Sequence, residues 1–189
     1  MIDYSKFLNN SIQEIKPSGI RKFFDIASEM DDVISLSIGE PDFQTPWHIR
    51  EEGINSLQNG KTWYSPNRGF AQLREEIANY YARRFNISYE GKTQVLVTVG
   101  GSEAIDLAFR CLVSEGDEVI IPEPSFVCYE PLTHMAGGKA VIINTKAEDQ
   151  FRLKADDLEK AITDKTKLVV LPFPNNPTGA IMEKADLEA

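Results

Sequence analysis

The chain has 189 residues, of which 42% are hydrophobic, which is enough for one large domain or for one domain with an arm. Its net charge of −9 argues against nucleic acid as a partner, because phosphates are neutralised by clustered lysine and arginine. The first ten residues lack the apolar run of a signal peptide, and no apolar run approaches the ~20 residues of a membrane span. We therefore expect a soluble, cytoplasmic protein and interpret its acidity as a source of solubility.

The two cysteines, Cys111 and Cys128, lie apart from each other and from any histidine cluster. A zinc site needs several such ligands at close spacing, so we expect no metal site. Two isolated thiols favour a reducing compartment.

Residues 1–45 are predicted to form an N-terminal arm with a segment of a small domain. Residues 20–30 place apolar side chains on one helical face, and residues 33–38 alternate apolar and polar, which is typical of a short strand. A helix follows, for which Thr45 is the expected N-cap and Asn59-Gly60 the expected stop. Residues 70–85 are strongly periodic and predict a second helix.

From residue 92 onward, short apolar runs alternate with helical patterns. The expected strands are residues 94–99, 118–121, 140–143 and 167–171, and the expected helices are residues 102–112, 126–136 and 155–162. Continuous apolar strands that alternate with helices indicate a parallel sheet covered on both faces. Residues 46–189 are thus predicted to form an α/β domain, a three-layer α/β/α arrangement with a mostly parallel sheet.

Three of these strands end in residues that stop the ladder, namely Gly100-Gly101, Pro122-Glu-Pro124 and Pro172-Phe-Pro174. In open α/β sheets, ligands bind in the crevice outside the carboxyl ends of the strands. If the three strand ends lie side by side, we expect them to line one crevice.

The glycines before Ser102 and Glu103 open a helix, where unpaired N–H groups and the helix dipole favour an anion such as phosphate. An ordinary tight turn with Ser102 as the cap explains the same residues. The segment is not a dinucleotide fingerprint, since no third glycine follows at the required spacing, and it is not a P-loop.

Four more residues are candidates with ordinary alternatives. Phe126 could stack on a planar ring or belong to the core. Asn176 could hydrogen-bond a phenolate-type oxygen or a carboxylate, or serve only as a turn residue. The backbone N–H of Gly39 could bind a carboxylate. The Tyr64 hydroxyl could reach an anion, or Tyr64 could be a half-buried loop aromatic.

Taken together, these residues fall into motifs that stand in a familiar order. The motifs are Gly39-Glu-Pro-Asp-Phe43, Tyr64-Ser-Pro-x-x-Gly69-x-x-x-Leu-Arg74, Val97-Thr-Val-Gly-Gly-Ser-Glu-Ala104, Gly116-Asp-Glu-Val119, Pro124-Ser-Phe126 and Asn176-Pro-Thr-Gly179. Their order and spacing resemble class I/II aminotransferases, the pyridoxal-phosphate enzymes of fold type I. The resemblance covers nearly the whole chain from about Ile20.

The resemblance implies roles in holding pyridoxal 5'-phosphate. Gly101, Ser102 and Glu103 match the stretch that holds its phosphate. Phe126 matches the aromatic residue stacked on its pyridine ring, where many relatives have Trp or Tyr. Asn176 matches the asparagine that hydrogen-bonds the ring oxygen.

The resemblance also implies substrates and a partner. Gly39 matches the glycine whose backbone meets the substrate carboxylate, and Asn176 lies beside the same substrate. Tyr64 matches the tyrosine that reaches the phosphate of the neighbouring subunit, so a homodimer is implied. Amino acids and 2-oxo acids are the implied substrates.

One departure from the family is large. The Schiff-base lysine lies downstream of Asn-Pro-Thr-Gly in relatives, and no residue up to Ala189 matches it, since Lys184 is too close to Asn176. We therefore expect this chain to be the N-terminal part of an aminotransferase, with a large domain incomplete at its C-terminus, and to be inactive alone. A β-lyase or related enzyme on the same fold, and a non-catalytic aminotransferase-like module, remain alternatives.

Overall fold

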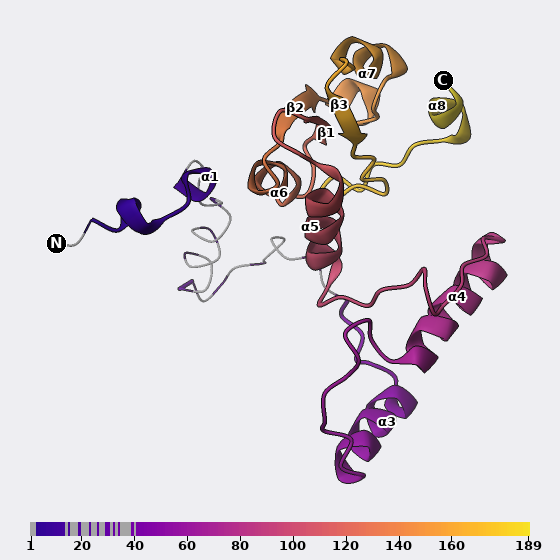
Figure 1. Ribbon diagram of the computed structural model, residues 1–189. Helices are drawn as coiled ribbons and strands as arrows, with labels where there is room; N and C mark the ends of the chain where they lie inside the picture. Colours follow the sequence, from indigo (N-terminus) through magenta and orange to yellow (C-terminus); the bar gives the residue numbers. More distant parts are fainter. Residues whose placement is uncertain are drawn as a thin grey trace. The chain divides into compact units, whose positions relative to one another are not determined.

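The computed structural model describes residues 3–13 and 41–189, together with positions 15, 19, 23, 26, 29, 30, 32, 34 and 39 (Figure 1). The chain divides into two compact units, one of Met1–Ser18 with Val99–Ala189 and the other of Gly19–Thr98. The expected helix at 20–30 and the expected strand at 33–38 lie largely outside the described residues. The expected domain boundary at residue 45 stays a prediction.

The first unit is built on a parallel sheet with strand order β2-β1-β3. Its strands are β1 (Glu118–Glu123), β2 (Lys139–Asn144) and β3 (Thr166–Val169). The central strand β1 is apolar on both faces, and its Val119 and Ile120 are completely buried. A strand covered on both sides needs apolar residues at every position, so the continuous apolar run was the correct signal.

Two helices cover one face of this sheet. In α5 (Gly101–Leu112), Ile105 and Phe109 lie four residues apart and therefore share a helix face, and Val113 continues that face. They pack with Val119 and Ile121 of β1 and with apolar residues of α6 (Tyr129–Met135). This cluster is the core of the first unit.

The helix α7 (Ala155–Ala161) contacts β2, and Figure 1 shows it beyond the sheet from α5 and α6. The three-layer α/β/α prediction is therefore confirmed. The remaining short elements of the unit are η1 (Tyr4–Phe7), α1 (Asn10–Gln13), η2 (Ala147–Asp149) and α8 (Lys184–Glu188).

Pro122 lies inside the central strand, although proline cannot donate to a ladder. Ile120 accepts a hydrogen bond from the N–H of Val170, so alternate residues of β1 face β3. The pairing with β3 ends at the Ile120 and Val169 pair, and Pro122 is paired only with Ile143 of β2. The missing N–H of Pro122 therefore points to the side where the neighbouring strand has already ended.

The second unit contains α3 (Trp47–Gln58) and α4 (Ala71–Phe85). The expected cap at Thr45 is wrong, because Pro46 is the N-cap, with an extended ψ of 140° and no side-chain capping bond. The expected stop at Asn59-Gly60 is confirmed, with Asn59 as the C-cap.

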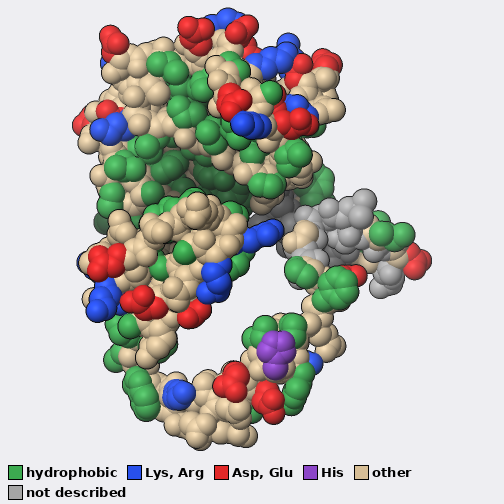
Figure 2. All heavy atoms as spheres, turned by 90° about the vertical axis from the view of Figure 1, so that its right-hand side faces the viewer, with side chains coloured by type: hydrophobic (Ala, Val, Ile, Leu, Met, Phe, Trp, Pro, Cys, Tyr) green, Lys and Arg blue, Asp and Glu red, His purple; other side chains and the backbone are tan. Residues whose placement is uncertain are grey.

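These two helices bury little apolar surface. In the described structure α3 has no buried residue, and α4 buries only Ala78. Large side chains such as Trp47 and Leu57 are more than half exposed, and Figure 2 shows hydrophobic side chains between charged ones on the face in view.

The expected strand at 94–99 is wrong. The N–H of Val97 donates to the carbonyl of Arg68, which lies in a loop, at 3.2 Å, and Leu96 is 52% exposed. A strand is defined by a neighbouring strand, and the three described strands pair only with one another. An apolar run with β propensity is therefore not sufficient to form one.

Candidate functional site

The amino end of α5 begins at a glycine with left-handed backbone. Gly100 is the N-cap with φ of +87°, and Gly101 and Ser102 are the first two helical residues, both exposed. The alternative in which Ser102 caps the helix is therefore wrong. The amino end of a twelve-residue helix presents N–H groups that have no carbonyl partner within the helix, which suits an anion.

Glu103 closes this turn from within the helix. Its carboxylate accepts a hydrogen bond from the backbone N–H of Val99, just before the N-cap. A third-position carboxylate that reaches back to the preceding backbone is a common way to satisfy a helix start. The Glu103 side chain is thus engaged by the protein, which leaves its backbone N–H as its contribution to an anion site.

The loop after β1 carries Phe126, which is half-buried. Its ring meets the Tyr129 ring edge to face, with centroids 6.0 Å apart and an interplanar angle of 86°. Burial raises the pKa of the Tyr129 hydroxyl and of the nearby Cys128 thiol. Phe126 therefore packs against a partly buried aromatic ring close to the carboxyl end of β1.

The loop after β3 is closed on itself by Asn175. The backbone N–H of Asn175 donates to the Ala180 carbonyl, and the Asn175 carbonyl accepts from the N–H of Gly179, each at 2.9 Å. Gly179 has φ of +71°, a conformation that a side chain disfavours. The closed loop leaves Asn176 exposed at its tip.

The two loops are tied together by a side chain that the sequence analysis did not single out. Asn175 is 7% exposed, and its Nδ2 donates to the carbonyl of Pro124 at 3.0 Å. Because β1 and β3 are adjacent in the sheet, this bond places the segments that carry Phe126 and Asn176 at one edge. The position of Asn175 beside Asn176 was the available signal, but its burial was not visible in the sequence.

Two of the three expected strand ends therefore lie side by side, the third is wrong, and the crevice itself stays a prediction. The loops after β1 and β3 meet, whereas Gly100-Gly101 does not follow a strand. The amino end of α5 belongs to the same unit as the two loops.

Gly39 and Tyr64 belong to the second unit. Tyr64 is completely exposed, and a Cβ added at Gly39 would meet no atom within 4 Å. Their roles stay predictions.

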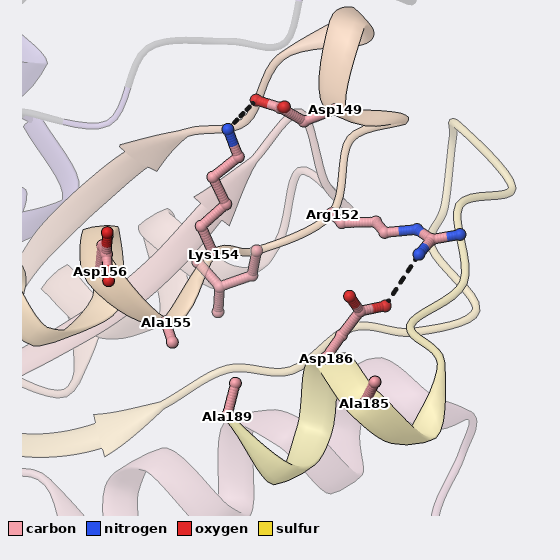
Figure 3. Close-up of a pocket in the computed structure, with 9 residues that line it drawn as sticks. Asp149, Arg152, Lys154, Ala155, Asp156, Ala185, Asp186 and Ala189 are labelled. Atoms are coloured by element: carbon pink, nitrogen blue, oxygen red, sulfur yellow. Dashed lines mark hydrogen bonds and ion pairs between the residues drawn. The ribbon is translucent and has the colours of Figure 1, made fainter.

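A separate cavity of about 440 Å³ lies near α8 and is lined by both charged and apolar residues (Figure 3). Arg152 bonds Asp186 at 3.1 Å, and Lys154 bonds Asp149 at 2.7 Å. Each of these cations already has a carboxylate partner, so the cavity does not offer a free positive charge to a phosphate.

The described parts of the chain contain neither a cluster of metal ligands nor a helix suited to a membrane. No group of three or more potential metal ligands is found among residues that the structure describes. None of the helices in the described ranges combines the length and apolar character needed to cross a bilayer.

Comparison with known proteins gives consistent matches. The model of the family "Aminotransferase class I and II" matches residues 31–189. The Bacillus subtilis protein YugH is 49% identical over 97% of this chain, and the aromatic-amino-acid aminotransferase 2 of Thermococcus litoralis is 44% identical over 96%. The chain spans about half of these relatives, 47% and 46% of their lengths.

Solved structures agree in fold. A Pyrococcus protein described as protein-A1 superposes with a TM-score of 0.90 at 45% identity, over 95% of this chain and 46% of its own. The aspartate aminotransferase of Thermus thermophilus with maleate gives a TM-score of 0.87 at 37% identity, over 96% and 48%. The chain belongs to the class I and II aminotransferase family.

Proposed function

We propose that this chain is the N-terminal part of a pyridoxal-phosphate-dependent aminotransferase, which moves an amino group between an amino acid and a 2-oxo acid. Family membership supports the reaction class. The observation that supports a cofactor site is the hydrogen bond from Asn175 to the Pro124 carbonyl, because it brings two candidate loops to one edge of the sheet.

The described residues have the chemistry that this cofactor requires. An exposed helix start offers N–H donors for a phosphate. Phe126 offers an aromatic face for a pyridine ring, and Asn176 offers an amide donor for a ring oxygen. These three kinds of contact match the phosphate, the ring face and the phenolic oxygen of pyridoxal phosphate.

Each residue then has a defined task. The N–H groups of Gly101, Ser102 and Glu103 hold the phosphate. Phe126 fixes the plane of the ring, and the Asn176 amide orients the ring by donating to its phenolic oxygen. When bound, the cofactor supplies an electron sink for bonds at the amino acid α-carbon.

Three further assignments belong to the same proposal. The Gly39 N–H binds the substrate carboxylate. Tyr64, which is completely exposed, reaches the phosphate of a second copy, so the active protein is a homodimer. Both cysteines are free thiols, which supports a reducing, cytoplasmic location.

The test uses the full-length gene product. Pyridoxal 5'-phosphate should give visible absorption, and the protein should consume an amino acid only when a 2-oxo acid is present. Because some relatives carry the names aromatic-amino-acid and aspartate aminotransferase, the amino acid panel should contain both classes. Failure to bind the cofactor contradicts the proposal, and release of pyruvate and ammonia without a 2-oxo acid would identify a β-lyase instead.

Variants of the two candidate contacts test their roles. Phe126→Ala should weaken cofactor binding about 2- to 13-fold, the effect of an aromatic contact of about 0.5–1.5 kcal/mol, while Phe126→Tyr should retain it. Asn176→Ala should move the pH dependence of the visible absorption, because the phenolic oxygen loses a donor that stabilises its anion. An unchanged spectrum in Asn176→Ala counts against its role.

We also propose that residues 1–189 alone do not transaminate, since they lack a lysine in the expected position. Borohydride reduction in the presence of pyridoxal 5'-phosphate should not label one unique lysine of the isolated chain. A single labelled lysine, identified by peptide mapping, would overturn this.

A further inference from the structure

We propose that Asn175 is a positioning residue that fixes the spacing between the ring contacts Phe126 and Asn176. The inference rests on the proposed function, because the ring that these two residues would hold is that of the cofactor. Asn175 itself is 7% exposed and is not assigned to contact the ligand.

Asn175 makes hydrogen bonds both within its own loop and to the neighbouring loop. Its backbone N–H and carbonyl bond Ala180 and Gly179, and its side chain bonds the Pro124 carbonyl. Asn176 is the next residue along the chain, and Phe126 follows Pro124 by two residues. A change in the Asn175 carboxamide therefore moves both ring contacts relative to each other.

The orientation of the carboxamide is determined by its partner. The Pro124 carbonyl is only an acceptor, so the amide nitrogen of Asn175 must face it. The Asn175 Oδ1 is then buried without a partner among the described residues. A buried acceptor without a donor lowers stability, so stability alone would favour an apolar residue of this size. The asparagine is thus explained by the bond to Pro124 and the loop geometry that it imposes.

The variant Asn175→Leu distinguishes a role in positioning the ring contacts from a role in stability. It removes the bond to Pro124, and it also removes the unpaired oxygen, so the melting temperature should stay near wild type. The affinity for pyridoxal 5'-phosphate should fall about 3- to 10-fold, the effect of one lost hydrogen bond. Asn175→Ala provides a second variant of smaller volume.

The matched control is Thr145→Val, one strand away. The Thr145 hydroxyl donates to the carbonyl of Glu123 at 2.8 Å, beside Pro124, but its loop carries neither ring contact. The backbone N–H of Thr145 bonds the same carbonyl, so the carbonyl stays satisfied in the variant. The cofactor affinity of Thr145→Val should match wild type.

The full-length protein is titrated with pyridoxal 5'-phosphate and, in competition, with inorganic phosphate. Loss of cofactor affinity with unchanged phosphate competition supports the inference, because only the ring contacts have moved. Amide exchange at Gly179 should also accelerate in Asn175→Leu and stay at the wild-type rate in Thr145→Val.

Three results would overturn the inference. These are an unchanged cofactor affinity in both Asn175 variants, a parallel loss of affinity for cofactor and inorganic phosphate, and an equal loss in Thr145→Val. A wild-type protein that binds no cofactor contradicts the proposed function itself, and the inference falls with it.

Discussion

At Gly138, at the entry to β2, a single added methyl group should lower the stability of the first unit. A Cβ added there would lie 2.5 Å from Val113 Cγ1 and 3.3 Å from both the Asp117 carbonyl oxygen and Thr133 Cγ2. Carbon atoms prefer separations near 3.5–4.0 Å, so the methyl group would be about 1 Å too close to Val113. Val113 and Thr133 are both buried, which limits their freedom to move aside.

The size of the effect follows from two opposing contributions. Overpacking of a core by one methyl group costs about 1–3 kcal/mol. Replacing glycine by alanine where the backbone allows it restores about 0.4–1 kcal/mol through the unfolded state. Gly138→Ala should therefore destabilise the first unit by about 1–2 kcal/mol, or lower its melting temperature by roughly 4–16 °C at about 4–8 °C per kcal/mol for a unit of this size.

The cause is tested by a double-mutant cycle with Val113→Ala, which removes the clashing Cγ1. The two substitutions should show a favourable coupling of about 1 kcal/mol, because the new methyl group fills space that Val113 has left. Effects that add within about 0.5 kcal/mol would refute the steric explanation. Gly53→Ala in α3 is the control with the opposite sign, since no atom lies within 4 Å of its added Cβ.

The stability of Gly138→Ala must be measured with a probe located in the first unit. Both tryptophans, Trp47 and Trp63, lie in the second unit, so tryptophan fluorescence is a probe of that unit. Amide exchange at Val119 and Ile121, in the buried central strand, measures the stability of the first unit directly.

Two further predictions concern titratable groups of the first unit. The pKa of Glu118 is lowered because its carboxylate accepts hydrogen bonds from Thr163 at 2.7 Å and from Lys139 at 3.0 Å. The stability that Glu118 contributes is therefore present above the ordinary carboxyl pKa of about 4.3 and is lost as the pH falls through the lowered value. Glu118→Gln should thus reduce the melting temperature at neutral pH and make it depend less on pH in the acid range. An unchanged dependence of the melting temperature on acid pH would contradict this. Burial raises the pKa of Cys128, so iodoacetamide should modify exposed Cys111 faster at neutral pH, as peptide mapping can measure, and equal rates would contradict the burial.

The fold of the first unit was predictable because its signals are local. Each strand is a short apolar run bounded by glycine, proline or charged residues, and the central strand needs no alternation when both faces are covered. Predicted and observed boundaries differ by three residues at most. For example, α6 begins at Tyr129 rather than at Phe126, since residues 127–128 form a turn.

The errors came from interactions between distant residues. The apolar run at 94–99 has the composition of a strand, but its Val97 bonds a loop carbonyl. Gly138 lies in the link before β2, where a glycine is ordinary, yet it is also constrained by close packing against Val113. Neither the missing strand neighbour nor the close packing can be recognised from the local sequence pattern.

The residues of the candidate site also differ in whether the local sequence indicates them. Residue chemistry made Phe126, Asn176 and the start of α5 candidates, because each lies at the boundary of an element and each has a distinct binding chemistry, and their roles stay predictions. Asn175 was missed, since a buried asparagine and an exposed one look alike in a sequence. Its partner, Pro124, lies 51 positions away.

The central strand β1 has side-chain hydrogen bonds at both ends, and residues 119–122 between them are apolar. At its amino end, Glu118 joins Lys139 of β2 and Thr163 before β3. At its carboxyl end, Asn175 joins the loop after β3 to Pro124. Only the carboxyl end carries candidate ligand contacts. Glu118→Gln should therefore lower stability without changing cofactor affinity, whereas Asn175→Leu should lower cofactor affinity without changing stability. A stability contact and a positioning contact on one strand can therefore be separated by experiment.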